Sequence, residues 1–196
     1  GRWDPAENRL KEARYLSNLP LEEVTIAETL REAGYRTAFV GKWHLGPLPY
    51  YYPEHQGFDH NIAGTDYGAP GDYWYPYEGS WKIPTTPHRL VKEDLLPGKR
   101  GDYLTDKLAE AGARFIDENA EHPFFLMMSH YSVHTPLQGK PEKVARYEAV
   151  PEADRQGMPH YAAMVESIDD SVGAIVEALR RNEIEENTLI IFTSDN

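Results

Sequence analysis

The chain has 196 residues, of which 40% are hydrophobic and 27% charged, and its formal net charge at pH 7 is −12. This balance is typical of a folded domain and excludes an intrinsically disordered chain. The acidic charge argues against nucleic acid as a partner, because nucleic acid binds to basic surfaces. No apolar run approaches the roughly 20 residues that span a bilayer, so no transmembrane segment is expected. The lack of cysteine excludes a disulfide, a thiolate zinc site and a cysteine nucleophile within these residues.

The first helical pattern covers residues 21–33 and leads into a short strand. Gly34 ends this pattern, and residues 37–40 form a short, largely apolar run. The apolar side chains that recur at helical spacing on one face are Val24, Ala27 and Leu30. The pattern therefore predicts a helix followed by a buried strand.

A long region from about residue 47 to residue 100 is rich in Pro, Gly, Tyr and Trp. A stretch of this length without periodicity indicates a functional loop region or an insertion. Its aromatic residues cluster at 50–52 and 67–77, with Trp81 close by. Such rings can stack on sugar faces, and they can equally fasten a long loop to the fold, so both interpretations stay open.

Two further helix-then-strand units follow, with apolar runs at residues 124–128 and 188–193. The apolar stripes of their helices are Leu104, Leu108, Ala111 and Phe115 in one, and Tyr161, Val165, Ile168, Val172, Ile175 and Leu179 in the other. Three such units predict an α/β fold with a largely parallel (mixed) sheet flanked by helices, and residues 1–196 are expected to belong to one domain. The uninterrupted apolar runs fit strands that are covered on both faces.

Polar side chains follow all three predicted strands. In open α/β sheets, ligands bind outside the carboxyl ends of the strands, so these residues are expected on one rim. The candidates are Lys42, His44, His130, His134, Asp195 and Asn196.

Residues 34–46, GYRTAFVGKWHLG, resemble the second signature of the type I sulfatases, which belong to the alkaline phosphatase superfamily. Further segments are similar to the same family in the same order: 55–59 (HQGFD), 123–126 (PFFL), 134–136 (HTP) and 193–196 (TSDN). The resemblance runs from about residue 19 to residue 196 and is weakest between 64 and 101. It implies a sulfatase-like α/β domain that hydrolyses sulfate esters.

The resemblance also implies roles for single residues. Lys42 would bind a sulfate oxygen and contact a formylglycine nucleophile, and His44 would hold that nucleophile and accept a proton. His134 would protonate the leaving group, whereas His130 is expected to be structural. Asp195 and Asn196 carry hard oxygen ligands, which suit Ca²⁺, with Mg²⁺ as the alternative.

The chain departs from the family pattern at the nucleophile. Sulfatases make formylglycine from a Cys or Ser within C/S-x-P-x-R and use a pair of acidic metal ligands, and neither motif is in this sequence. Both are expected upstream of Gly1, with a further lysine downstream of Asn196, so the chain is expected to be an interior segment of the catalytic domain that is inactive alone. A phosphodiesterase or phosphonate monoester hydrolase of the same superfamily, and a non-catalytic fragment, are the alternatives.

The family suggests a sulfated small molecule or carbohydrate as substrate. It also suggests a periplasmic, extracellular or lysosomal location, although no residue of the chain indicates one. The sequence gives no oligomeric state. One further group, the carboxylates Glu166, Asp169 and Asp170 on the last predicted helix, is expected to face water.

Overall fold

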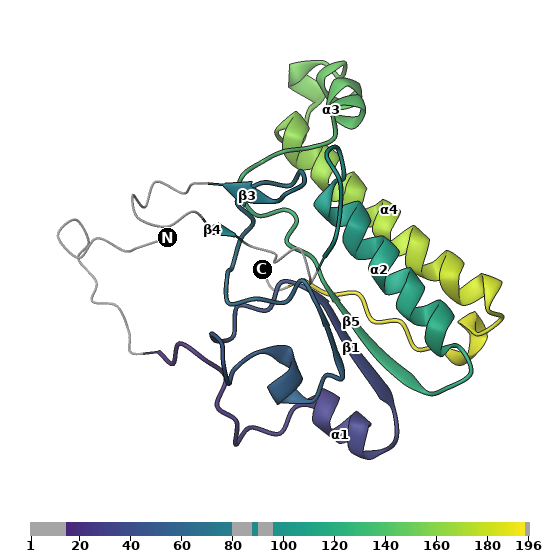
Figure 1. Cartoon of the computed structure of the whole chain (residues 1–196). Coiled ribbons are helices and arrows are strands. Elements are labelled where there is room, and N and C mark those ends of the chain that lie inside the picture. The colour runs from purple at the N-terminus through teal and green to yellow at the C-terminus, as the bar shows by residue number, and fades with distance from the viewer. Residues whose placement is uncertain (1–14, 80–87, 90–95, 195–196) are drawn as a thin grey trace.

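A three-stranded parallel sheet lies at the centre of the computed structural model, which describes residues 15–79, 88–89 and 96–194 (Figure 1). The strand order is β2 (His60–Ile62), β1 (Arg36–Gly41), β5 (Phe124–Ser129). The β1–β5 register runs from Arg36 beside Phe124 to Gly41 beside Ser129. The predicted parallel sheet flanked by helices is therefore confirmed, and β1 and β5 end at the same edge.

Helix α1 (Ile26–Glu32) is shorter than predicted because its N-terminus is capped within the predicted span. The Thr25 hydroxyl accepts a hydrogen bond from the Glu28 backbone N–H at 3.1 Å, and the Glu28 carboxylate accepts one from the Thr25 N–H at 2.8 Å. This capping box satisfies two helix-end donors, so the helix begins after Thr25. Val24 consequently lies outside the helix and is 80% exposed, whereas Ala27 is fully buried as predicted.

The described part of the 47–100 region is packed onto the core. It contains the 3₁₀ helix η1 (Pro53–Gln56), strand β2 and the two-residue strands β3 (Glu78–Gly79) and β4 (His88–Arg89), which pair antiparallel. Tyr73 and Tyr77 are buried in the main hydrophobic cluster, and Trp74 packs against it. These rings fasten the region to the fold, while Trp81 lies outside the described residues.

Helices α2 (Leu104–Asn119) and α4 (Pro159–Arg181) lie side by side along the sheet (Figure 1). The predicted buried face of α2 is confirmed. On α4 the predicted face is only partly right: Leu179 is buried and Ile175 packs against the core, whereas Tyr161 and Val165 are 44% and 45% exposed. Its buried residues are Ala163, Met164, Ser167, Ser171, Ala178 and Leu179. No helix in the described ranges is long and apolar enough to cross a membrane.

A glycine on α2 allows α4 and β5 to approach that helix closely. A Cβ on Gly112 of α2 would lie 2.9 Å from Ile175 of α4 and 2.6 Å from Met128 of β5. The buried Ser167 hydroxyl donates to the Ala163 carbonyl at 2.9 Å, so burying it leaves no unpaired donor.

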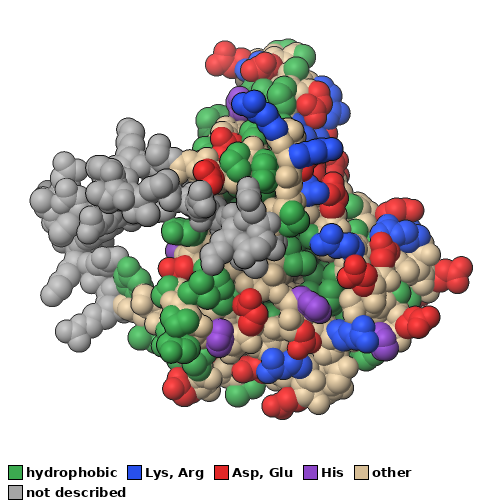
Figure 2. Space-filling model, in the orientation of Figure 1, with side chains coloured by type: hydrophobic (Ala, Val, Ile, Leu, Met, Phe, Trp, Pro, Cys, Tyr) green, Lys and Arg blue, Asp and Glu red, His purple; other side chains and the backbone are tan. Residues whose placement is uncertain are grey.

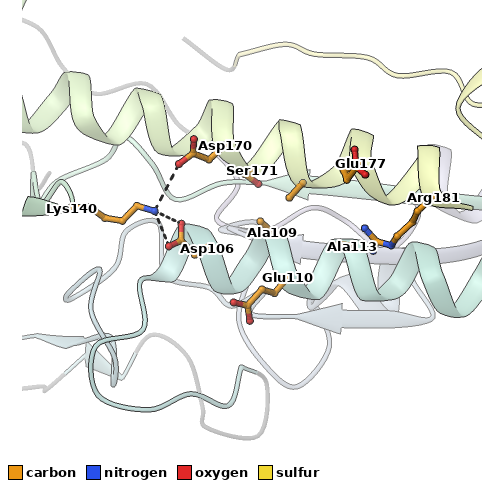
Figure 3. Close-up of a pocket in the computed structure, with 10 residues that line it drawn as sticks. Asp106, Ala109, Glu110, Ala113, Lys140, Asp170, Ser171, Glu177 and Arg181 are labelled. Atoms are coloured by element: carbon orange, nitrogen blue, oxygen red, sulfur yellow. Dashed lines mark hydrogen bonds and ion pairs between the residues drawn. The ribbon is translucent and has the colours of Figure 1, made fainter. Parts of the chain in front are cut away.

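Helix α3 (Pro141–Glu148) is fastened to α2 and α4 by ion pairs. Just before α3, the Lys140 ammonium lies 2.9 Å from both carboxylate oxygens of Asp106 on α2, and 3.8 Å from Asp170 on α4 (Figure 3). Lys143 pairs with Asp170 and, at 3.2 Å, with Glu166. Figure 2 shows acidic and basic side chains interspersed over the part of the surface that α2, α3 and α4 form. Glu166 and Asp170 are thus anchors for α3, a role that the sequence did not predict.

The run at residues 188–193 does not form the predicted third strand. It follows the 3₁₀ helix η3 (Glu185–Asn187), and none of the strands in the described ranges pairs with it. Leu189, Ile191 and Phe192 are 86%, 77% and 75% exposed. An apolar run becomes a strand only where a neighbouring backbone pairs with it, and the described residues provide no such neighbour. The prediction is therefore wrong for this structure.

Candidate functional site

Lys42 lies where two parallel strands end together. Its backbone N–H donates to the Ser129 carbonyl at 2.6 Å, and the Ser129 hydroxyl donates to the Lys42 carbonyl at 2.8 Å. These two bonds continue the β1–β5 pairing one residue beyond Gly41 and fix the half-buried Lys42 at the edge of the sheet.

The preceding residue allows this close approach only because it is glycine. Gly41 has φ +111°, a value that L side chains rarely adopt, and a Cβ there would lie 1.9 Å from the Ser129 carbonyl oxygen. A side chain at this position would push the two strand ends apart, and Lys42 would move with β1.

His44 is held on the same segment by its neighbours. Trp43 is buried, its indole N–H donates to the Tyr51 carbonyl at 2.6 Å, and its ring stands edge-on to Phe39. The exposed His44 has φ 56° and donates its backbone N–H to the Thr65 carbonyl at 3.0 Å.

The His44 imidazole also faces a glycine. A Cβ on Gly68 would lie 2.4 Å from both Cε1 and Nδ1 of the ring, although the backbone of Gly68 lies outside the left-handed region. The space that the ring occupies therefore exists because residue 68 has no side chain.

His134 lies on the loop that leaves the carboxyl end of β5. Its side chain is exposed, and Nδ1 lies 3.0 Å from the Thr135 carbonyl oxygen. The buried Tyr73 hydroxyl contacts the carbonyls of Tyr131 and His134 at 2.8 and 3.0 Å. The backbone of this loop is thus anchored in the core while its imidazole faces outward.

His130, by contrast, is turned into the protein. Its Nε2 lies 3.1 Å from the Ser171 hydroxyl of α4, and its Nδ1 is buried with no hydrogen-bond partner. Burial lowers the pKa of His130 to about 4, so the ring is neutral near pH 7. This environment fits the structural role that was expected for it and makes it a poor proton donor.

The predicted metal ligands Asp195 and Asn196 lie outside the described residues. Within residues 15–79, 88–89 and 96–194, no group of three or more His, Cys, Asp or Glu side chains could hold a metal ion. The described part of the chain alone therefore does not make a metal site.

One groove in the described structure is separate from the strand ends. It measures about 470 Å³, lies between α2 and α4, and has charged side chains such as Asp106, Lys140 and Arg181 around alanines (Figure 3). None of the residues at the strand ends lines it. The chemistry-bearing side chains are those at the strand ends, where a lysine and two exposed histidines can bind an anion and transfer protons.

Sequence patterns did not indicate the residues that hold these side chains. Ser129 follows the apolar run at residues 124–128 and was assigned no role, and Tyr73 was only one of many aromatic residues in a long region. No spacing rule relates Tyr73 to His134, because their contact joins segments that are about sixty residues apart. For Ser129, the signal is its place as the last residue of β5 beside Gly41, which a correct register would reveal.

Comparison with known proteins places the whole arrangement in context. The family model described as Sulfatase matches residues 4–196. N-acetylgalactosamine-6-sulfatase of Homo sapiens is 31% identical over an alignment of 201 positions that covers 97% of this chain and 36% of that protein. Arylsulfatase G of Rattus norvegicus is 31% identical, covering 92% of this chain and 37% of that protein.

Solved structures agree with this match. The crystal structure of Ps i-CgsB has a TM-score of 0.63 and 30% identity, covering 85% of this chain and 38% of that one. The same protein in complex with k-i-k-neocarrahexaose gives a TM-score of 0.62 and 31% identity, with the same coverage. The chain thus spans a little over a third of the length of these relatives.

Proposed function

The chain belongs to the sulfatase family, and we propose that the protein of which it is a part hydrolyses sulfate esters. The observation that carries this proposal is the family match over residues 4–196, within which Lys42 and His44 follow β1 at the edge that it shares with β5. In this reaction a nucleophile forms a bond to sulfur while the bond between sulfur and the ester oxygen breaks. Negative charge must therefore be stabilised on the sulfuryl oxygens and on the departing oxygen.

Lys42 is proposed to bind a sulfuryl oxygen. It is half-buried at the strand end, where its backbone is fixed by Ser129, so its ammonium is placed with little freedom of the main chain. A cation that is already positioned stabilises developing charge without reorganising during the reaction.

His134 is proposed as the general acid and His44 as the residue that accepts a proton. Histidine suits both tasks because its ordinary pKa is close to physiological pH. Both imidazoles are exposed on backbone segments that the core holds in place, and the buried, neutral His130 is unsuitable for either task.

A nucleophile and a metal complete the proposal from outside the described residues. The family resemblance implies a formylglycine as the attacking group and a divalent cation, Ca²⁺ or Mg²⁺, that withdraws charge from a sulfate oxygen. Asp195 and Asn196 are proposed as two of the cation ligands because they offer hard oxygen atoms. The described residues alone fit neither group, so no step is assigned to them.

A sulfated carbohydrate is the proposed substrate class. Two relatives at 30% identity or above support it: one is named N-acetylgalactosamine-6-sulfatase, and the other was solved with k-i-k-neocarrahexaose. Neither name fixes the sugar or the sulfated position for this protein.

The test uses the full-length protein with sulfated oligosaccharides, an aryl sulfate and an aryl phosphodiester. We expect sulfate release, and we expect Lys42→Ala to abolish most of it while Lys99→Ala, which alters an exposed lysine elsewhere, leaves it unchanged. Faster hydrolysis of the phosphodiester than of every sulfate ester would overturn the proposal in favour of the phosphodiesterase alternative.

A further inference from the structure

We propose that Ser129 is a positioning residue for Lys42, so that its hydroxyl group contributes to catalysis without touching the substrate. This inference rests on the proposed function, because it assumes that Lys42 binds the sulfuryl group. It concerns a residue at the end of β5 to which the sequence assigned no role.

The geometry around Lys42 supports this proposal. Regular pairing of β1 with β5 ends at Gly41 and Ser129, so the Lys42 carbonyl lies beyond the last ladder partner. The Ser129 hydroxyl donates to that carbonyl at 2.8 Å and provides the hydrogen bond that the sheet no longer supplies. The peptide plane between Lys42 and Trp43 is therefore fixed by one side chain.

The hydrogen bond from Ser129 to the Lys42 carbonyl lies directly after Gly41, where the backbone has a positive φ. Gly41 has φ +111°, and the strand ends lie so close that a Cβ there would meet the Ser129 carbonyl at 1.9 Å. Ser129 holds both sides of this junction, since its carbonyl accepts from the Lys42 N–H and its hydroxyl donates to the Lys42 carbonyl. Without the hydroxyl, the Lys42 carbonyl can rotate, and the direction of the side chain changes with it.

The experiment compares Ser129→Ala with Ser129→Thr, which keeps the hydroxyl, in the full-length protein. One neutral hydrogen bond corresponds to roughly a 3- to 10-fold change in an equilibrium or rate. We expect Ser129→Ala to lower kcat/KM by about that factor for sulfate esters of good and poor leaving groups alike, because Lys42 meets the sulfuryl group that they share. Ser129→Thr is expected to restore most of the loss.

A double-mutant cycle separates positioning from a general structural effect. In the Lys42→Ala background, Ser129→Ala is expected to cost nothing further, because the group that it positions is absent. The matched control is Ser167→Ala, which also removes a hydroxyl that donates to a backbone carbonyl, but on α4. We expect it to lower the melting temperature without changing kcat/KM.

Two results would overturn the inference. One is wild-type kcat/KM in Ser129→Ala, and the other is an equal loss with and without Lys42. Failure of the proposed function is distinguishable from both, since the wild-type protein would then not hydrolyse sulfate esters at all.

Discussion

Replacing Lys143 with methionine tests how helix α3 is held. The Lys143 side chain is only 6% exposed, and its ammonium pairs with Asp170 and, at 3.2 Å, with Glu166. Methionine keeps the buried aliphatic stem and removes the charge, so packing changes little while Asp170 and Glu166 each lose one of their two cation partners. Lys140 remains 3.8 Å from Asp170, and Arg146 still pairs with Glu166.

The expected loss in the free energy of unfolding of Lys143→Met lies between two limits. Removing one partner of a fully buried ion pair costs about 3–5 kcal/mol, whereas an exposed pair contributes about 0–1 kcal/mol. Glu166 is 23% and Asp170 51% exposed, and each keeps a second cation, so water and that neighbour compensate part of the loss. We expect about 1–2 kcal/mol, which lowers the melting temperature of a domain of this size by roughly 2–8 °C.

The pKa of Glu166 determines how the stability difference between wild type and Lys143→Met changes with pH. Desolvation would raise the pKa of Glu166, but its hydrogen bonds with Lys143 and Tyr147 outweigh it, and the pKa is lowered. A lowered carboxyl pKa contributes stability that is present above the unfolded value of about 4.3 and is lost as the pH falls through the folded value. The difference between wild type and Lys143→Met is therefore expected to be full at pH 7 and to shrink below about pH 4.

Thermal unfolding followed by circular dichroism measures this, with Lys99→Met as the control at an exposed site. Equal melting temperatures for wild type and Lys143→Met at pH 7 would refute the reasoning. A difference that is as large at pH 3 as at pH 7 would show that packing, and not charge pairing, holds α3.

Three further predictions concern histidines. His134→Ala is expected to lower kcat/KM far more for sulfate esters with poor leaving groups than for nitrophenyl esters, because only a strongly basic oxygen needs a proton to leave; equal losses would exclude it as the acid. Because the pKa of His130 is lowered to about 4 by burial, wild type should lose stability as the pH falls from about 6.5 to 4, and His130→Gln should show a smaller loss in denaturant titrations; parallel curves would contradict this. Gly68→Ala should displace the His44 ring and reduce kcat with little change in melting temperature, whereas Gly157→Ala, which has open space around it, should change neither; wild-type kcat in Gly68→Ala would disprove the contact.

The central strands could be predicted because their sequence and their burial agree. Phe39 and Val40 belong to an apolar run that is buried in β1, and the helix before β5 presents Leu104 and Leu108 to the core as its spacing indicates. Prediction failed where tertiary contacts determine which side chains are buried. Helix α4 buries Ser167 and Ser171 and exposes Val165, because tertiary contacts such as that between Ser171 and His130 determine which of its side chains are covered.

The candidate site also contains residues that could be predicted from the sequence and residues that could not. Lys42 and His134 were found from strand ends and from a family motif, whereas the groups that hold them were not. Ser129 and Tyr73 donate hydrogen bonds to the backbone carbonyls of Lys42 and His134. Because every residue type has a backbone carbonyl, no pattern of side chains in the sequence indicates these contacts. Such partners become visible only when the register of the strands and the path of the loop are known.

The unpaired run at residues 188–193 has a practical consequence for anyone who expresses this stretch of chain. Leu189, Ile191 and Phe192 are largely in water, and Met127 on the outer strand β5 is 42% exposed. A strand with an open edge beside exposed apolar side chains is a template for pairing with another copy. Preparations limited to these residues should therefore precipitate or need detergent, and charged substitutions at 189 and 191 should improve their recovery.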